Sequence, residues 1–115
     1  MTPLAPRRGE IWLVEFDPSV GTEIRKTRPA VVVSNDVANA RTSKVTVVPV
    51  TSTIRRLPLV VIVEPSAENG LDKESLIRVP DVSTFDKIRF KRRLGSLQPE
   101  EVTSLDEKLR VHLSL

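Results

Sequence analysis

The chain has 115 residues, its 18 Lys and Arg exceed its 15 Asp and Glu to give a net charge of +3, and it contains no cysteine. The lack of cysteine excludes disulfides, thiol nucleophiles and zinc–thiolate sites. The longest apolar run, residues 57–63, is too short to cross a bilayer. We therefore expect one domain over residues 1–115, located in the cytoplasm and not associated with a membrane.

Apolar and β-branched residues predict a chain made mostly of strands. The longer patterns cover residues 11–16, 29–34, 44–51 and 59–64, and shorter ones cover 75–79, 82–85 and 91–96. Two helices are predicted, a short one over residues 37–41 with Asp36 as its N-cap, and an amphipathic one that begins at Pro99. Many short strands closed by one terminal helix predict a mainly β fold, a small and strongly curved barrel with a C-terminal α-helix.

One arginine stands directly before a proline and a run of valines, in the segment Thr27-Arg28-Pro29-Ala30-Val31-Val32-Val33. Proline restricts the residue before it to extended geometry, so we expect Arg28 to be held at the mouth of a strand. The strand over residues 44–51 ends in a cluster of hydroxyl side chains, Thr51, Ser52 and Thr53. A fixed cation and converging hydroxyls predict a phosphate site.

Positive charge gathers at strand ends rather than along the whole chain. The basic groups are Arg7-Arg8, Arg25-Lys26-Arg28, Arg55-Arg56 and Lys91-Arg92-Arg93, while Glu100, Glu101, Asp106 and Glu107 lie near the C-terminus. This distribution predicts a positive face, as expected of a protein that binds nucleic acid. With only one Trp and three Phe in the chain, a base-stacking platform of aromatic rings is not expected.

An ordered series of motifs resembles the MazF/PemK family of ribonuclease toxins. The series runs through Arg8-Gly9-Glu10-Ile11-Trp12, Phe16-Asp17-Pro18, Val20-Gly21-Thr22-Glu23, residues 28–36 and Pro49-Val50-Thr51-Ser52, and continues more loosely to the final helix. The resemblance implies an SH3-like (PemK/CcdB-like) barrel that forms a homodimer and cuts single-stranded RNA without a metal or cofactor. It also implies that Arg28 and Thr51 are the catalytic pair, and that a cognate antitoxin with an acidic, disordered tail restrains the toxin of this type II system.

The chemistry of RNA fits this assignment, because a 2′-OH can attack the adjacent phosphorus and leave a 2′,3′-cyclic phosphate and a 5′-OH end. Arg28 would bind the phosphate oxygens and Thr51 would orient the phosphate or the 2′-OH. Arginine is a poor general base, so Glu23 is a speculative candidate for that role, although it could equally be an ion-pair partner of Arg25 or Lys26. The residues expected to bind RNA are Thr22, Ile24, Arg25, Lys26, Thr27, Ser52, Thr53, Arg55, Arg56, Val82 and Ser83.

Two departures from the family pattern bear on the target sequence, and two other readings of the chain stay open. Relatives often carry glutamine and glycine where this chain has residues 24–26, and an acidic residue with glutamine where it has Asp81-Val82, so recognition can differ. The sole histidine, His112, is expected to be a helix cap or a surface residue. The alternatives are a noncatalytic RNA-binding relative and a CcdB-like gyrase poison, which the same fold would accommodate.

Overall fold

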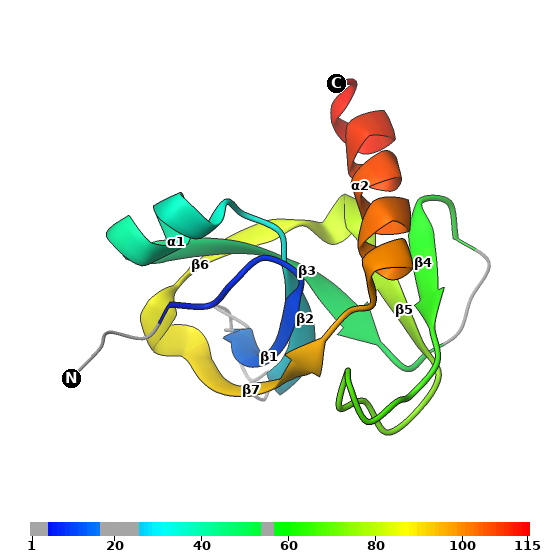
Figure 1. Ribbon diagram of the computed structural model, residues 1–115, viewed down its shortest axis with the longest axis horizontal. Helices are drawn as coiled ribbons and strands as arrows, with labels where there is room; N and C mark the ends of the chain where they lie inside the picture. The colour runs from blue at the N-terminus through cyan, green and yellow to red at the C-terminus, as the bar shows by residue number, and fades with distance from the viewer. Residues whose placement is uncertain (1–4, 17–25, 54–56) are drawn as a thin grey trace, which may run out of the picture.

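The computed structural model describes residues 5–16, 26–53 and 57–115 of the chain. The strands in these residues are β1 (Glu10–Phe16), β2 (Lys26–Val32), β3 (Lys44–Thr51), β4 (Val60–Val63), β5 (Ser75–Arg78), β6 (Ser83–Asp86) and β7 (Phe90–Ser96). The helices are α1 (Asp36–Arg41) and α2 (Pro99–Leu113), with 3-10 turns η1 (Val79–Asp81) and η2 (Lys87–Arg89). The predicted class, mainly β with a C-terminal α-helix, is confirmed (Figure 1).

The strands form one strongly curved antiparallel sheet in the order β4-β5-β3-β2-β1-β7, and β6 pairs with β3 off this path. Strand β3 holds the sheet together because it uses both of its edges. One edge pairs with β2 through Val47, Val48 and Pro49. The other edge pairs with β6 near its start, from Lys44 to Val47, and with β5 at its end, through Val50 and Thr51.

Apolar side chains cover both faces of the β1–β2–β3 part of the sheet, which explains the uninterrupted valines of β2. One cluster contains Ile11, Val31, Val48, Val50, Val61, Val63, Leu71, Ile77, Val79, Leu97 and Leu105, and α2 lies over it. The second cluster contains Trp12, Val14, Ala30, Val32, Val45, Val47 and Phe90. The ring of Trp12 meets Phe90 edge-on at 6.1 Å, an arrangement that aromatic pairs favour.

The predicted bounds of β2 were wrong at both ends. The strand begins at Lys26, three residues before Pro29, and ends at Val32, so Arg28 lies within a strand and pairs with Val14 of β1. Proline at position 29 is compatible with this, because β2 pairs with β3 only from Ala30 onward and Pro29 therefore needs no N–H on that edge. The extended geometry expected for Arg28 is present, supplied by β1.

Both predicted helices are present, but the N-cap of the first was misassigned. Asn35, not Asp36, caps α1, and its Oδ1 accepts hydrogen bonds from the N–H groups of Val37 (2.7 Å) and Ala38 (3.3 Å). At the start of α2 the Gln98 N–H donates to the carboxylate of Glu101 at 2.7 Å. Within the described ranges, no helix has both the length and the apolar character needed to cross a membrane.

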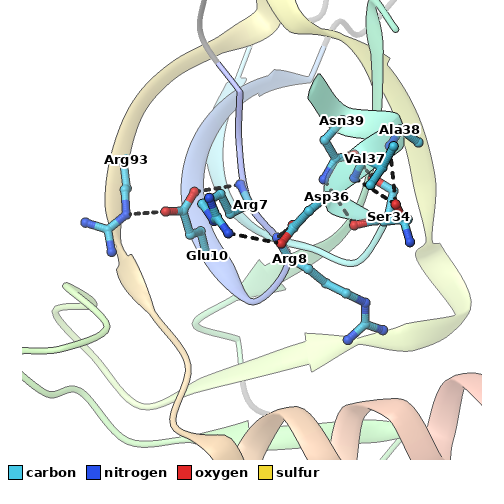
Figure 2. Close-up of polar contacts among 10 residues, drawn as sticks. Arg7, Arg8, Glu10, Ser34, Asp36, Val37, Ala38, Asn39 and Arg93 are labelled. Carbon is cyan, nitrogen blue, oxygen red and sulfur yellow. Dashed lines mark hydrogen bonds and ion pairs between the residues drawn. The ribbon is translucent and has the colours of Figure 1, made fainter. Parts of the chain in front are cut away.

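Three of the arginines assigned to a positive face are instead paired with carboxylates. Figure 2 shows two of these pairs, Arg7 with Asp36 and Arg93 with Glu10. The backbone N–H of Arg8 donates to Asp36 (2.6 Å). Its side chain donates from Nε to the Val33 carbonyl (2.9 Å) and from Nη2 to Asp106 of α2 (2.8 Å). Arg7 lies 3.5 Å from Asp36, and Arg93 donates to Glu10 at 2.9 Å. These residues join the N-terminal segment to α1, α2 and β7, so their role is structural.

Candidate active site

Arg28 and Thr51 occupy matching positions on neighbouring strands. The β2–β3 register pairs Ala30 with Pro49, and continuing it by two residues aligns Arg28 with Thr51. Side chains alternate along a strand, so residues two positions from a registered pair lie on the same face as that pair. The predicted catalytic residues therefore align in the extrapolated register and lie on one face of the sheet, the face of Ala30 and Pro49.

The two strands separate at this point. Pairing between β2 and β3 stops at Ala30 and Pro49, while the end of β3 continues to pair with β5, Val50 with Ile77 and Thr51 with Leu76. The separation leaves a hollow of about 250 Å³, lined by Pro29, Val50, Ser52, Leu71, Asp72, Lys73 and Ser75. Pro29 follows Arg28, and Val50 and Ser52 flank Thr51, so the hollow lies at the same end of the sheet as the predicted catalytic pair. Because neighbouring residues of a strand point to opposite faces, the hollow opens on the face that carries Val50, and Arg28 and Thr51 lie on the other face. We call the hollow the β3–β5 cleft.

The guanidinium group of Arg28 is exposed. In the described part of the chain it has neither a hydrogen-bond nor an ion-pair partner, in contrast to Arg7, Arg8 and Arg93. Its backbone is fixed by pairing with β1 on one side, opposite Val14. A positioned and unpaired guanidinium is suited to a planar, bidentate contact with phosphate oxygens.

The hydroxyl group of Thr51 is oriented by the chain that follows it. Its Oγ1 accepts a hydrogen bond from the backbone N–H of Thr53 at 3.2 Å. A threonine hydroxyl has one proton to donate and two lone pairs, so this contact leaves the proton available to a ligand. Thr51 is half-buried at the end of β3, where the sheet limits its movement.

The far wall of the β3–β5 cleft belongs to the long connection between β4 and β5, residues 64–74, whose place in the fold is not predicted by any local sequence pattern. Buried Asn69 organises it, because its Oδ1 accepts from the N–H groups of Ser66 (3.0 Å) and Leu71 (2.9 Å) and its Nδ2 donates to the Glu64 carbonyl (2.8 Å). Nearer the cleft, the hydroxyl of Ser75 donates to the Lys73 carbonyl at 2.8 Å. The connection is thus internally braced.

This connection also contacts the end of β7, and Figure 1 shows the two side by side. The Ser96 N–H donates to the Glu68 carbonyl at 2.8 Å. Gly95 allows the approach, since a Cβ there would lie 2.1 Å from the Glu68 oxygen. Gly70 has φ +69°, a left-handed conformation that glycine adopts without strain. The far wall of the cleft is therefore fixed against the opposite edge of the sheet.

With this geometry established, sequence comparison places the chain among known proteins. Residues 7–113 match the family described as PemK-like, MazF-like toxin of type II toxin-antitoxin system. The chain belongs to this toxin family. It is 39% identical to "Endoribonuclease MazF9" of Mycobacterium tuberculosis over 95% of this chain and 97% of the relative. It is 30% identical to "Endoribonuclease EndoA" of Bacillus subtilis over 95% of each.

The fold agrees with that of solved members of the toxin family. One structure, titled as an endoribonuclease in complex with its cognate antitoxin from a mycobacterial species, superposes with a TM-score of 0.78 at 27% identity, covering 96% of this chain and 97% of that one. The resemblance inferred from the motifs is confirmed, and the homologues are endoribonucleases.

Three further residues predicted to bind RNA lie at the same end of the sheet as Arg28 and Thr51. Thr27 is exposed on β2 opposite Glu15, and Ser52 and Thr53 are exposed just after β3. Several predicted residues lie outside the described residues, namely Thr22, Glu23, Ile24, Arg25, Arg55 and Arg56, as does the side chain of Lys26.

Val82 and Ser83 lie apart from the end of the sheet that carries Arg28 and Thr51. Ser83 pairs with Val47, four residues along β3 from Thr51 and therefore about 13 Å away. Val82 packs against the core and lines a different hollow, of about 400 Å³, together with Val33, Thr46 and the C-terminal half of α2. His112 is half-buried in the last turn of α2.

Two features concern the acidic side chains of the described residues. Within the described residues, no three His, Asp or Glu side chains gather where they could hold a metal ion. The pKa of Glu64 is raised because protonated Glu64 donates a hydrogen bond to the Glu74 carboxylate, and because that neighbour is negatively charged. The two glutamates continue the β4–β5 register one step beyond Val63 and Ser75, which explains why two like charges meet there.

Proposed function

We propose that this chain is a toxin that cuts single-stranded RNA without a metal ion, by attack of a 2′-OH on the adjacent phosphorus, leaving 2′,3′-cyclic phosphate and 5′-OH ends. Membership of the toxin family and the endoribonuclease relatives support the reaction class. The observation that supports the site is the alignment of Thr51 with Arg28, which is unpaired within the described residues, at the point where β2 and β3 separate.

Arg28 is assigned to the scissile phosphate. Negative charge grows on the non-bridging oxygens as the 2′-oxygen attacks, and a guanidinium already in place stabilises that charge without reorganising. The loss of one such preorganised donor typically costs roughly 10²–10³-fold in rate, about 3–4 kcal/mol. Pairing with β1 supplies the preorganisation, since it fixes the backbone from which the side chain projects.

Thr51 is assigned to orientation. Its Oγ1 already accepts the Thr53 N–H, so its proton can be donated to a phosphate oxygen and hold the phosphorus in line with the 2′-OH. The 2′-OH proton needs a different acceptor, because the arginine side chain stays protonated. We assign that role to Glu23, which would take the proton directly or through a water molecule.

The RNA is proposed to run across the end of the sheet that carries Arg28 and Thr51 and past Thr27, Ser52 and Thr53, with Thr22, residues 24–26, Arg55 and Arg56 adding backbone contacts. A second copy of the chain would extend the groove across a twofold axis, as the family resemblance implies. A cognate antitoxin would cover it with an acidic tail that competes for the cations near Arg28. The relative solved in complex with its cognate antitoxin supports such a partner.

The test compares four proteins on single-stranded RNA in the presence of EDTA: wild type, Arg28→Ala, Thr51→Val and Arg41→Ala. Arg41 is a matched control, because it is an exposed arginine at the end of α1, away from the cleft. We expect the wild type and the control to produce cyclic phosphate ends, Arg28→Ala to be slower by roughly 10²-fold or more, and Thr51→Val to be intermediate. Full activity of Arg28→Ala, or cleavage only after a metal is added, would contradict the proposal.

The same preparation separates the other two readings of the fold. A gyrase poison would leave RNA intact and alter gyrase-dependent supercoiling of a plasmid, and a noncatalytic relative would bind RNA without cutting it. Sedimentation addresses the dimer: full activity of a protein that remains monomeric at the assay concentration would contradict a groove shared by two copies.

A further inference from the structure

The four aromatic residues of the chain all belong to the second apolar cluster or pack against it, on the face of the sheet that carries Arg28. Trp12 and Phe90 are buried members of this cluster, 7% and 5% exposed. Phe16 and Phe85 pack against the cluster and are only half-buried. The aromatic side chains of β1 thus become more accessible from Trp12 to Phe16, where the strand ends.

Phe16 is a diagonal neighbour of Arg28 across the pairing of β1 with β2. The register pairs Val14 with Arg28. Phe16 lies two positions further along β1 and pairs with Lys26, so Phe16 and Arg28 share one face of the sheet. Cβ atoms of such diagonal neighbours are roughly 7 Å apart, within reach of aromatic and long side chains. A half-exposed ring therefore lies next to the guanidinium, at a separation similar to that of a base and the phosphate of its own nucleotide.

The rings of Phe16 and Phe85 contact each other edge-on, with centroids 4.8 Å apart and planes inclined at 73°. In such a contact the edge of one ring meets a face of the other, so the pair leaves ring surface on which a planar group can stack. Both rings come from fixed backbone. Phe85 pairs with Val45 of β3, and the end of β1 is held by Arg89, whose Nη1 donates to the Glu15 carbonyl at 3.4 Å. A ring held in this way stacks with a smaller loss of entropy than one on a loose loop.

We propose that Phe16, braced by Phe85, is a base-stacking residue that holds the base of the nucleotide whose phosphate Arg28 binds. This inference rests on the proposed function. A nucleotide combines a planar ring with an anionic phosphate, and this end of the sheet combines an accessible aromatic ring with a guanidinium that is unpaired within the described residues. Single-stranded RNA is therefore favoured over an antitoxin peptide as the ligand of Phe16.

Stacking and phosphate binding respond differently to salt. A cation that neutralises a phosphate releases a counterion, and loss of one such contact on a single strand reduces the salt slope of log K by about 0.7. An aromatic ring releases no counterion. Removal of the Phe16 ring should therefore weaken binding at an unchanged slope, whereas Arg28→Ala should reduce the slope. Phe16→Leu is the informative change, because leucine keeps an apolar side chain against Phe85 and lacks the flat aromatic face.

The experiment measures binding of a short, mixed-sequence single-stranded RNA whose riboses carry 2′-O-methyl groups, so that no 2′-OH can attack. A series of such strands has one abasic position each, moved along the strand. Binding is titrated over a range of salt concentrations for wild type, Phe16→Leu, Phe16→Tyr, Arg28→Ala and Phe90→Leu. Phe90 is the matched control, a buried ring of the same cluster that contacts Trp12. Cleavage of unmodified RNA is measured in parallel.

We expect Phe16→Leu to lower the affinity for intact RNA about tenfold at a wild-type salt slope, and Phe16→Tyr to bind as wild type. One abasic position should weaken wild-type binding by a similar factor and leave Phe16→Leu unaffected, because the contact is already lost in that variant. Phe90→Leu should keep the wild-type response to that position, although it loses stability.

Three results would overturn the inference. They are independent effects of Phe16→Leu and of every abasic position, a reduced salt slope in Phe16→Leu, and weaker binding of a cognate antitoxin peptide with unchanged RNA binding. If wild type fails to cut unmodified RNA, the proposed function fails, while the coupling between the variant and the abasic position still decides the role of Phe16.

Discussion

Replacement of Gly95 by alanine tests whether the β4–β5 connection is truly fixed against β7. The new Cβ would lie 2.1 Å from the Glu68 carbonyl oxygen and 2.6 Å from the carbonyl carbon of Asn69. Both contacts are with backbone rather than with the flexible end of a side chain. The variant must therefore push the connection away from the sheet or distort β7.

The expected cost follows from these contacts. Overpacking of this kind typically costs about 1–3 kcal/mol, and loss of the hydrogen bond from Ser96 to Glu68 adds about 1 kcal/mol. We expect Gly95→Ala to lose about 2–4 kcal/mol of unfolding free energy, which for a domain of this size lowers Tm by about 8–16 °C.

Urea denaturation and amide hydrogen exchange together measure this effect. Gly9→Ala serves as the comparison. The backbone of Gly9 has φ +88°, a conformation that strains an alanine, but the nearest atom to a Cβ there is Val102 Cγ2 at an ordinary contact distance of 3.6 Å. It should lose stability through backbone strain alone and keep the Ser96 amide protected. If Gly95→Ala unfolds within about 0.5 kcal/mol of wild type and its Ser96 amide stays protected, the close contact between the connection and β7 does not exist.

Three other expectations follow from the described contacts. Because Glu74 raises the pKa of Glu64, the folded state holds that proton more tightly than the unfolded state, and stability falls as pH rises through the raised value; Glu74→Gln should therefore raise Tm at neutral pH and make little difference near about pH 4. Leu105→Ala removes the buried residue by which α2 contacts the core and should cost about 2–5 kcal/mol in chemical denaturation. An acidic antitoxin tail should inhibit cleavage competitively with RNA and bind the Arg28→Ala variant more weakly; equal affinities in a titration would remove the electrostatic part of that expectation.

The strands were predictable from sequence because their β-branched residues carry a strong local signal. Residues 44–51 were assigned with the observed bounds, whereas the start of β2 was missed because proline was read as the beginning of a strand. The strand begins earlier because residues 26–28 pair with β1. A local sequence pattern does not reveal which strand will be its partner. The N-cap of α1 was missed for a related reason, since Asn35 and Asp36 are both good caps and only the backbone chooses between them.

Only part of the candidate site could be proposed from sequence, because one short motif carries it. Arg28 and Thr51 could be singled out as candidates, but the approach of the β4–β5 connection to this end of the sheet could not, because the pairing of β3 with β5 joins residues far apart in the chain. Local charge counting also assigned Arg8 to a positive surface. The structure shows that Asp106 pairs with the guanidinium of Arg8 and that Asp36 accepts its backbone N–H. Neither partner is near Arg8 in the sequence.

The support of the β4–β5 connection by the end of β7 has a consequence for the order in which the sheet is completed on the ribosome. A ribosome makes Arg28 and Thr51 early, but the connection rests on Gly95 and Ser96, which emerge only when most of the chain has been made. At roughly 5–20 residues per second, several seconds separate the two events. We expect a nascent chain to carry Arg28 and Thr51 on a sheet whose last strand is still missing, with the β4–β5 connection not yet held in place.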